Sequence, residues 1–304
     1  MNYPKNFREF DKIFPDDKAC LRFLEEVRWK TTFVCQSCGG NEYWSKSSGL
    51  RRCKSCRFDN SVKVGSVFES SRLSLKTWFY AIWWITVQKT GVSALGLQRN
   101  LGLGSYRSAW LLLHKIRNAT IHADRSFLAG EVEVDEAFIG GFKSGKRGRG
   151  AEGRQLIVIA AECVGKRRVG RIRIQKINDA SAKTLEKFIV GTISKGSVIY
   201  TDGWRGYNDV TGLGYKHVAT KSATVDPDEL LPRINSVTAL FKRWLLGTLH
   251  GRLDEKHMDS YFEEFVFRFN RRTSKARGQL FQRVIENSFR VSPAPYKKII
   301  SRKS

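Results

Sequence analysis

The sequence predicts an α/β protein in which a mixed sheet follows a small cysteine-rich module and a helical region. Three observations support this class. Two cysteine pairs stand near the N-terminus, helical patterns fill the next segment, and strand patterns begin at Glu131. We therefore divide the chain into residues 1–70, 71–128 and 129–291, followed by a basic tail over residues 292–304.

Composition indicates what kind of partner the protein has. The chain has 304 residues, enough for two or three domains, and its 41% hydrophobic content argues against wholesale disorder. A formal net charge of +25 favours a polyanion. Nucleic acid fits better than an anionic membrane or a ribosome-like surface, because basic residues are spread through every segment. No apolar run reaches the roughly 18 residues of a membrane span, and no secretory signal is recognisable, so we expect a cytoplasmic protein without a membrane partner.

Four cysteines have the spacing of a metal site. Cys35 and Cys38 form one Cys-x-x-Cys pair, and Cys53 and Cys56 form a second. Each pair brings two thiolates into one tight turn, and two such turns make a closed tetrahedral site for structural Zn²⁺. A redox dithiol is the alternative, but two motifs in one small module disfavour it. The sequence predicts a zinc ribbon.

The second segment has the pattern of a helix-turn-helix. One helical stretch ends at Gly102-Leu103-Gly104, and a second begins at Ser105. In this interpretation Ser105, Tyr106 and Arg107 open the second helix and face a DNA major groove. An ordinary αα-hairpin in a helical core is the alternative. The neighbouring zinc ribbon and the positive charge favour DNA contact.

The third segment begins with alternating polar and apolar residues, the pattern of a β-strand. Residues 131–135 form a strand with three acids on one face. Glu131 and Glu133 are assigned to its solvated surface, and the alternative is that either one supports a metal ligand without binding the metal itself. The stretch from Gly140 to Arg154 is interpreted as a flexible basic loop, and we expect Lys146, Arg147 and Arg149 to bind DNA there. The remaining predicted elements are a buried strand over 156–161, an outer strand over 166–175, a helix over 180–193 and a strand over 197–200.

Two aspartates close strands of this sheet, and two further polar residues follow on a helix. Asp135 and Asp202 stand at or just past expected strand ends, where carboxylates can share divalent metals. Asn235 and Lys242 are seven positions apart, so on a helix they share one face. Asp202 before a glycine has an alternative interpretation as a turn residue, and Asn235 as a helix start. Their joint occurrence favours a site in which Asn235 adds a ligand and Lys242 holds a phosphate.

At these residues the sequence resembles a known family. VDEAFIGG around Asp135, YTDGWRGY around Asp202, KRWLLGTLHG after Asn235 and a later YFEEFVFRFNRR resemble the blocks of bacterial insertion-sequence transposases of the DDE superfamily, in the subgroup with a DDNK signature. The resemblance spans about residues 15–290. Asn235 departs from the commonest pattern, which places glutamate at the third position.

The resemblance implies both a fold and an activity. The fold is an RNase H-like catalytic core. The activity is polynucleotidyl transfer: recognition of terminal inverted repeats in double-stranded DNA, nicking that frees a 3′-hydroxyl, and transfer of that end into target DNA by a two-metal mechanism with Mg²⁺ or Mn²⁺. Asp135, Asp202 and Asn235 would bind the metals and Lys242 the phosphate. Arg243, Arg271 and Arg272 are further candidate DNA contacts, and such enzymes generally work as homo-oligomers on DNA.

Two other functions fit the same residues. A catalytically impaired or domesticated relative would bind DNA regardless of Asp135 and Asp202. A structure-specific nuclease would cut DNA without joining it. The DNA-recognition modules that precede the sheet favour the transposase.

Overall fold

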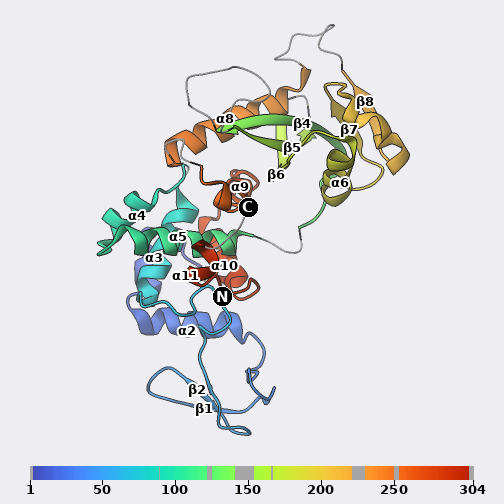
Figure 1. The fold of residues 1–304 in the computed structure, drawn as a ribbon. Helices are drawn as coiled ribbons and strands as arrows, with labels where there is room; N and C mark the ends of the chain where they lie inside the picture. The colour runs from blue at the N-terminus through green and yellow to red at the C-terminus, as the bar shows by residue number, and fades with distance from the viewer. Residues whose placement is uncertain are drawn as a thin grey trace. The chain divides into compact units, whose positions relative to one another are not determined.

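The computed structural model describes residues 3–88, 90–121, 125–140, 154–165, 167–220, 230–249 and 253–300. The chain forms two compact units (Figure 1). One comprises residues 1–122 and 274–303, and the other residues 123–273. The predicted DNA contacts Lys146, Arg147 and Arg149 lie outside the described residues. Within the described ranges, no helix combines the length and apolar character that crossing a membrane requires.

The first unit begins with two helices and a small cysteine-bearing sheet. Three short antiparallel strands lie in the order β1-β2-β3. These elements are α1 (Phe7–Ile13), α2 (Asp17–Arg28), β1 (Tyr43–Ser45), β2 (Arg51–Cys53) and β3 (Asp59–Asn60). Asp16 caps α2 by accepting a hydrogen bond from the Ala19 N–H, as its position before the apolar pattern indicates.

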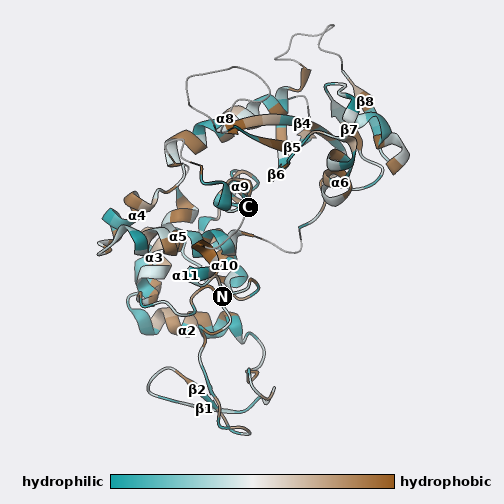
Figure 2. Cartoon of the chain, viewed as in Figure 1, coloured by the Kyte–Doolittle hydropathy of each residue, from teal (hydrophilic) through white to brown (hydrophobic). Residues whose placement is uncertain are grey.

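Helices make up the rest of this unit. They are α3 (Leu75–Val87), α4 (Ala94–Leu101), α5 (Tyr106–Thr120), α10 (Arg277–Ser288) and α11 (Tyr296–Ile300). The apolar run leaves most side chains of α3 buried, although Figure 2 draws this helix in mixed colours because it also contains tryptophan, tyrosine, threonine and lysine. An aromatic core joins these helices. The Phe281 ring of α10 lies 5.6 Å from Phe10, 5.6 Å from Phe14 and 5.4 Å from Phe79, measured between ring centroids.

The C-terminal helices differ from what the sequence suggested. We placed residues 129–291 in one catalytic domain, whereas α10 packs against α2, α3 and α5 of the first unit. The reason is the aromatic core, which Phe281 completes. The residues after 291 also hold a helix, α11, whose Ile299 side chain is 3% exposed. At least this part of the predicted tail therefore contributes to a core.

The two helices of the expected helix-turn-helix are present. Gly102 ends α4 in the left-handed conformation with φ of 60°, which glycine adopts without strain. Ser105 then caps α5 by accepting a hydrogen bond from the Ser108 N–H across 3.1 Å. The role of this pair in DNA binding stays a prediction.

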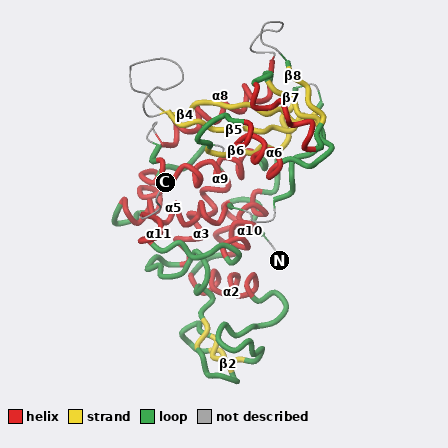
Figure 3. The backbone as a smooth tube through the Cα atoms, turned by 45° about the vertical axis from the view of Figure 1, so that its right-hand side comes forward, coloured by secondary structure: helices red, strands yellow, loops and turns green. Residues whose placement is uncertain are grey.

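The second unit is built on a five-stranded mixed sheet in the order β6-β5-β4-β7-β8 (Figure 3). Strands β4, β5 and β6 pair antiparallel, whereas β7 and β8 run parallel to β4. The strands are β4 (Glu131–Gly140), β5 (Arg154–Val164), β6 (Arg168–Lys176), β7 (Val198–Thr201) and β8 (Lys216–Ala219). The mixed α/β prediction is confirmed, and the expected outer strand, β6, lies at a sheet edge.

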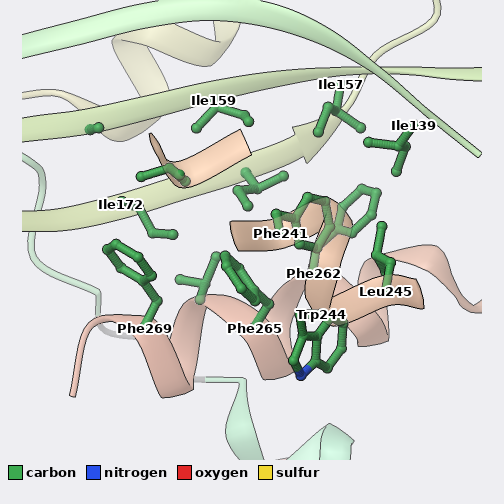
Figure 4. Packing of buried hydrophobic residues seen from close by; sticks show 14 of the residues in the cluster. Ile139, Ile157, Ile159, Ile172, Phe241, Trp244, Leu245, Phe262, Phe265 and Phe269 are labelled. Atoms are coloured by element: carbon green, nitrogen blue, oxygen red, sulfur yellow. The ribbon is translucent and has the colours of Figure 1, made fainter. Parts of the chain in front are cut away.

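Helices cover both faces of this sheet. Val132 and Val134 of β4 face α6 (Ala182–Thr192) and the 3₁₀ helix η1 (Arg205–Leu213). The opposite face packs against α8 (Pro232–Leu249) and α9 (Met258–Phe269), which the 3₁₀ helix η2 (Glu255–His257) precedes. Figure 4 shows Phe241 of α8 and Phe262 of α9 beneath the strand isoleucines. The fixed alternation of side chains along β4 therefore decides which residues face α8.

Candidate active site and metal centre

Asp135 and Asp202 lie on neighbouring strands. Strands β4 and β7 are parallel, and their register pairs Glu133 with Tyr200. Asp135 and Asp202 each come two positions after this pair, so a continuation of the same register brings them side by side. Asp202 directly follows β7, as expected. Asp135 does not end its strand, because β4 continues to Gly140 through its pairing with β5.

The surroundings of Asp135 favour a bound cation. Burial and the negative charges of Glu136 and Asp202 raise the pKa of Asp135 to about 7. A partly buried carboxyl group crowded by other acids is stabilised in its ionised form when a divalent cation binds. The oxygen donors of Asp135 and Asp202 therefore fit a hard cation such as Mg²⁺ or Mn²⁺.

A cavity of about 660 Å³ opens beside Asp135. Its walls come from β4, the start of β5 and one face of α8, and they include Asn235, Thr238 and Lys242. Helical spacing places these three side chains on the same face of α8. The structure thus brings Asp135, Asn235 and Lys242 to one cavity, with Asp202 beside Asp135 although it does not line the cavity itself.

Glu133 is not on a solvated surface, which corrects the expectation from strand alternation. Its side chain is 3% exposed. It accepts hydrogen bonds from the backbone N–H groups of Arg233 and Ile234, each across 2.9 Å. The Arg233 guanidinium Nη1 also donates to it across 2.8 Å. Burial is possible because three donors at the start of α8 satisfy the charge.

Glu136 points to the other face of β4 and has a partner that the sequence did not reveal. The buried phenol of Tyr207 in η1 donates a hydrogen bond to Glu136 Oε1 across 2.6 Å. Burial and the charge of Glu136 raise the pKa of Tyr207 far above its ordinary value, so the phenol keeps its proton. This bond fixes the acid that stands next to Asp135.

The four predicted zinc ligands converge. The Sγ atoms of Cys35, Cys38, Cys53 and Cys56 all lie within 4.8 Å of one another. Cys35 and Cys56 are 3.6 Å apart, as are Cys38 and Cys53. Zinc–sulfur bonds of about 2.3 Å place the sulfurs of a tetrahedral site roughly 3.8 Å apart. The sulfurs therefore fit a four-thiolate zinc centre.

Backbone and side-chain donors support these thiolates. Burial opposes ionisation of Cys35, yet the N–H groups of Cys38 and Ser37 and the amide of Asn60 lower the pKa of its thiol to about 6. Gly40 approaches the sulfurs so closely that a β-carbon there would lie 3.3 Å from Cys53 Sγ and 3.4 Å from Cys38 Sγ.

The candidate DNA contacts have varied surroundings. Tyr106 is 53% exposed at the start of α5, and the Arg107 guanidinium lies 4.1 Å from the ring centre of Tyr296 in α11. Arg243 is exposed on α8. At the end of α9, Arg271 stacks on Phe267, and Arg272 donates hydrogen bonds to the carbonyls of Phe269, Val169 and Gly170. Their DNA contacts stay predictions.

Comparison with known proteins identifies both parts of the chain. Residues 127–270 match the ISXO2-like transposase domain, and residues 15–58 match the transposase zinc-ribbon domain. A protein from Halobacterium salinarum, described as an uncharacterized protein in transposable element ISH50, is 23% identical over 280 residues, covering 84% of this chain and 92% of its own length. The zinc-ribbon match contains all four cysteines of the metal site and the transposase-domain match contains the paired aspartates, so the chain carries the zinc-ribbon and ISXO2-like domains of insertion-sequence transposases.

Proposed function

We propose that this protein is a DNA transposase that binds the terminal inverted repeats of an insertion sequence, nicks the ends and transfers the freed 3′-hydroxyl groups into target DNA. One observation carries the proposal. Asp135 and Asp202 are neighbours at the parallel strands β4 and β7, and Asp135 lines one cavity together with Asn235 and Lys242. Polynucleotidyl transfer needs this combination of anionic oxygens and a cation near one phosphate.

We further infer that the sheet unit is an RNase H-like core. Three antiparallel strands are followed by two strands parallel to the first, and the central strand β4 carries the first aspartate. Helices cover both faces of the sheet, and the cavity beside Asp135 leaves room for substrate. This arrangement supports the fold that the DDNK signature implies.

The chain's own residues have distinct roles in this mechanism. Asp135, Asp202 and Asn235 would hold two Mg²⁺ or Mn²⁺ ions, which when bound activate the attacking hydroxyl and stabilise the leaving oxygen. Asn235 offers a neutral amide oxygen where glutamate is commoner, so the two aspartates supply the negative charge of the metal site. Lys242 contributes a point charge for a phosphate, two helical turns from Asn235.

The first unit would find the DNA. Ser105, Tyr106 and Arg107 at the start of α5 would enter a groove, while the zinc ribbon holds a basic surface in a fixed shape. Arg243, Arg271, Arg272 and the loop residues Lys146, Arg147 and Arg149 would contact phosphates. Two protomers or more would bridge the two element ends, since both ends have to reach one target.

A strand-transfer assay tests this function. Purified protein is incubated with Mg²⁺ or Mn²⁺, labelled DNA carrying the element's ends and a target plasmid. We expect joined products from the wild-type protein, none from Asp202→Ala, and normal products from Asp209→Ala, which changes an exposed aspartate in η1. Binding to the element ends without cleavage would instead support the catalytically impaired relative, and cleavage without joining would support the structure-specific nuclease.

A further inference from the structure

We infer that Glu133 is a positioning residue that fixes α8, and with it Asn235 and Lys242, against the strand that carries Asp135. The inference rests on the proposed function, because it assigns a role within the same site. It follows from the contacts of the Glu133 carboxylate, which joins β4 to α8. These two elements are far apart in the sequence, since Arg233, which donates a hydrogen bond to Glu133, lies 100 positions further along the chain.

The first step concerns the strand. Glu133 and Asp135 are two residues apart on β4, so their side chains leave the same face of the sheet. Glu133 is buried in a sheet whose flanking strands pin its backbone on both sides, against Ala161 of β5 and Tyr200 of β7. The carboxylate is therefore a fixed point on the same rigid element as Asp135.

The second step concerns the helix. The donors to Glu133 are the backbone N–H groups of Arg233 and Ile234 in the first turn of α8, directly before Asn235. A carboxylate at this position satisfies N–H groups that have no partner inside the helix, and it interacts favourably with the helix dipole. Because a helix is stiff, fixing its first turn sets the rotation and height of Asn235, and of Lys242 two turns later.

The Arg233 side chain strengthens this link. Its Nη1 donates to Glu133 across 2.8 Å, and its Nη2 donates to the Gly165 carbonyl across 2.6 Å. A buried, charge-assisted set of three donors is stronger and more directional than a single neutral hydrogen bond. The backbone bonds attach the helix itself, so they, more than the ion pair, determine where Asn235 lies.

A conservative substitution separates positioning from stability. Glu133→Gln keeps the size of the side chain but removes its charge. It also replaces one carboxylate oxygen with an NH₂ group, which cannot accept hydrogen bonds from Arg233 and Ile234. We expect the Mn²⁺ concentration that gives half-maximal strand transfer to rise about 10- to 100-fold, as for other residues that orient metal ligands. The rate at saturating Mn²⁺ should fall as well, while the affinity for end DNA should change less than threefold.

The controls use neighbouring residues. Glu131→Gln alters an exposed acid on the same face of β4, which accepts a hydrogen bond from the Tyr200 hydroxyl across 3.3 Å, and it should behave as wild type. Arg233→Gln removes the ion pair but keeps both backbone bonds, and its Mn²⁺ requirement should lie between wild type and Glu133→Gln. Each variant is assayed at least 10 °C below its own unfolding temperature.

The outcomes are distinct. A Glu133→Gln protein with a lower unfolding temperature but the wild-type Mn²⁺ requirement would show that Glu133 only stabilises the fold, and would overturn the inference. An Arg233→Gln defect larger than that of Glu133→Gln would also overturn it. If the wild-type protein neither cuts nor joins DNA, the proposed function fails, and Mn²⁺ binding measured by electron paramagnetic resonance still tests Glu133.

Discussion

The side-chain amide of Asn60 donates a hydrogen bond to the sulfur of Cys35 across 3.4 Å, and Asn60 is completely buried. The same side chain accepts a bond from the Gln36 N–H and donates to the carbonyls of Arg51 and Phe58. One residue of β3 thus ties the first cysteine turn to the second strand. Its partners are a thiolate and backbone groups, which makes it a support of the metal site.

Replacement of Asn60 should therefore weaken zinc binding. We expect Asn60→Ala to lower the zinc affinity about 10- to 100-fold, because residues that orient metal ligands have effects of this size. Competition with a chromophoric chelator measures the affinity. Asn41→Ala, an exposed asparagine in the same ribbon, is the matched control. Equal zinc affinities for the two variants would show that Asn60 stabilises the fold but does not support zinc binding.

Asp135 should make the stability of the metal-free protein depend on pH. The folded protein holds its proton up to about pH 7, whereas an ordinary aspartate releases it near 3.8. Between these values the folded state binds more protons than the unfolded state, so the free energy of unfolding falls as pH rises. Asp135→Asn should remove this loss and stabilise the protein at pH 8 by roughly 1 to 4 kcal/mol.

Urea unfolding in EDTA at pH 5 and pH 8 measures the effect. The quantity to compare is the difference between the variant and the wild-type protein, since other groups titrate in both. Asp209→Asn, at an exposed site, should leave the difference near zero. A variant that is no more stable than wild type at pH 8 would contradict the crowding of charges at Asp135.

Lys242 should act on the reaction more than on binding. We expect Lys242→Ala to lower the rate of strand transfer at saturating DNA about 100-fold, the usual effect of removing a group that stabilises developing charge. Affinity for DNA should change little because one phosphate contact is lost among many, and the slope of log affinity against log salt should fall by about one. Lys187→Ala, exposed on α6 at the opposite face of the sheet, is the control.

The core under α8 gives a stability prediction. Phe241 is fully buried, and its ring centroid lies 4.7 Å from that of Phe265 in α9. Phe241→Ala should cost about 3 to 5 kcal/mol in the free energy of unfolding, since it opens a cavity between helix and sheet. The adjacent Leu240 is 44% exposed, and Leu240→Ala should cost less than about 0.5 kcal/mol. Denaturant unfolding of the full chain compares the two.

Features with a local cause could be predicted from the sequence. The cysteine spacing predicted that all four sulfurs form one site, because the conformation of each Cys-x-x-Cys turn depends mainly on the residues inside it. The Gly102 turn and the Ser105 cap are equally local. The alternation of apolar residues predicted the strands, and the spacing of Asn235 and Lys242 predicted their common helix face.

What could not be predicted depends on partners distant in the sequence. Glu133 looks like a surface residue in its own strand, and only the arrival of Arg233 and Ile234 makes its burial favourable. Tyr207 and Glu136 are likewise 71 positions apart. The apolar face of α10 indicates a buried helix but not which core it completes.

That last helix has a consequence for biosynthesis. The helical unit contains Phe10 and Phe79 from early in the chain and Phe281 from near its end, whereas the sheet unit is continuous over residues 123–273. On the ribosome the sheet unit is complete as soon as it emerges, but the helices before it keep an open aromatic surface until α10 follows. The unit that we propose to bind the DNA ends is thus finished last, after the unit that we propose to cut them, and a nascent chain that stalls after residue 273 exposes phenylalanines that promote aggregation.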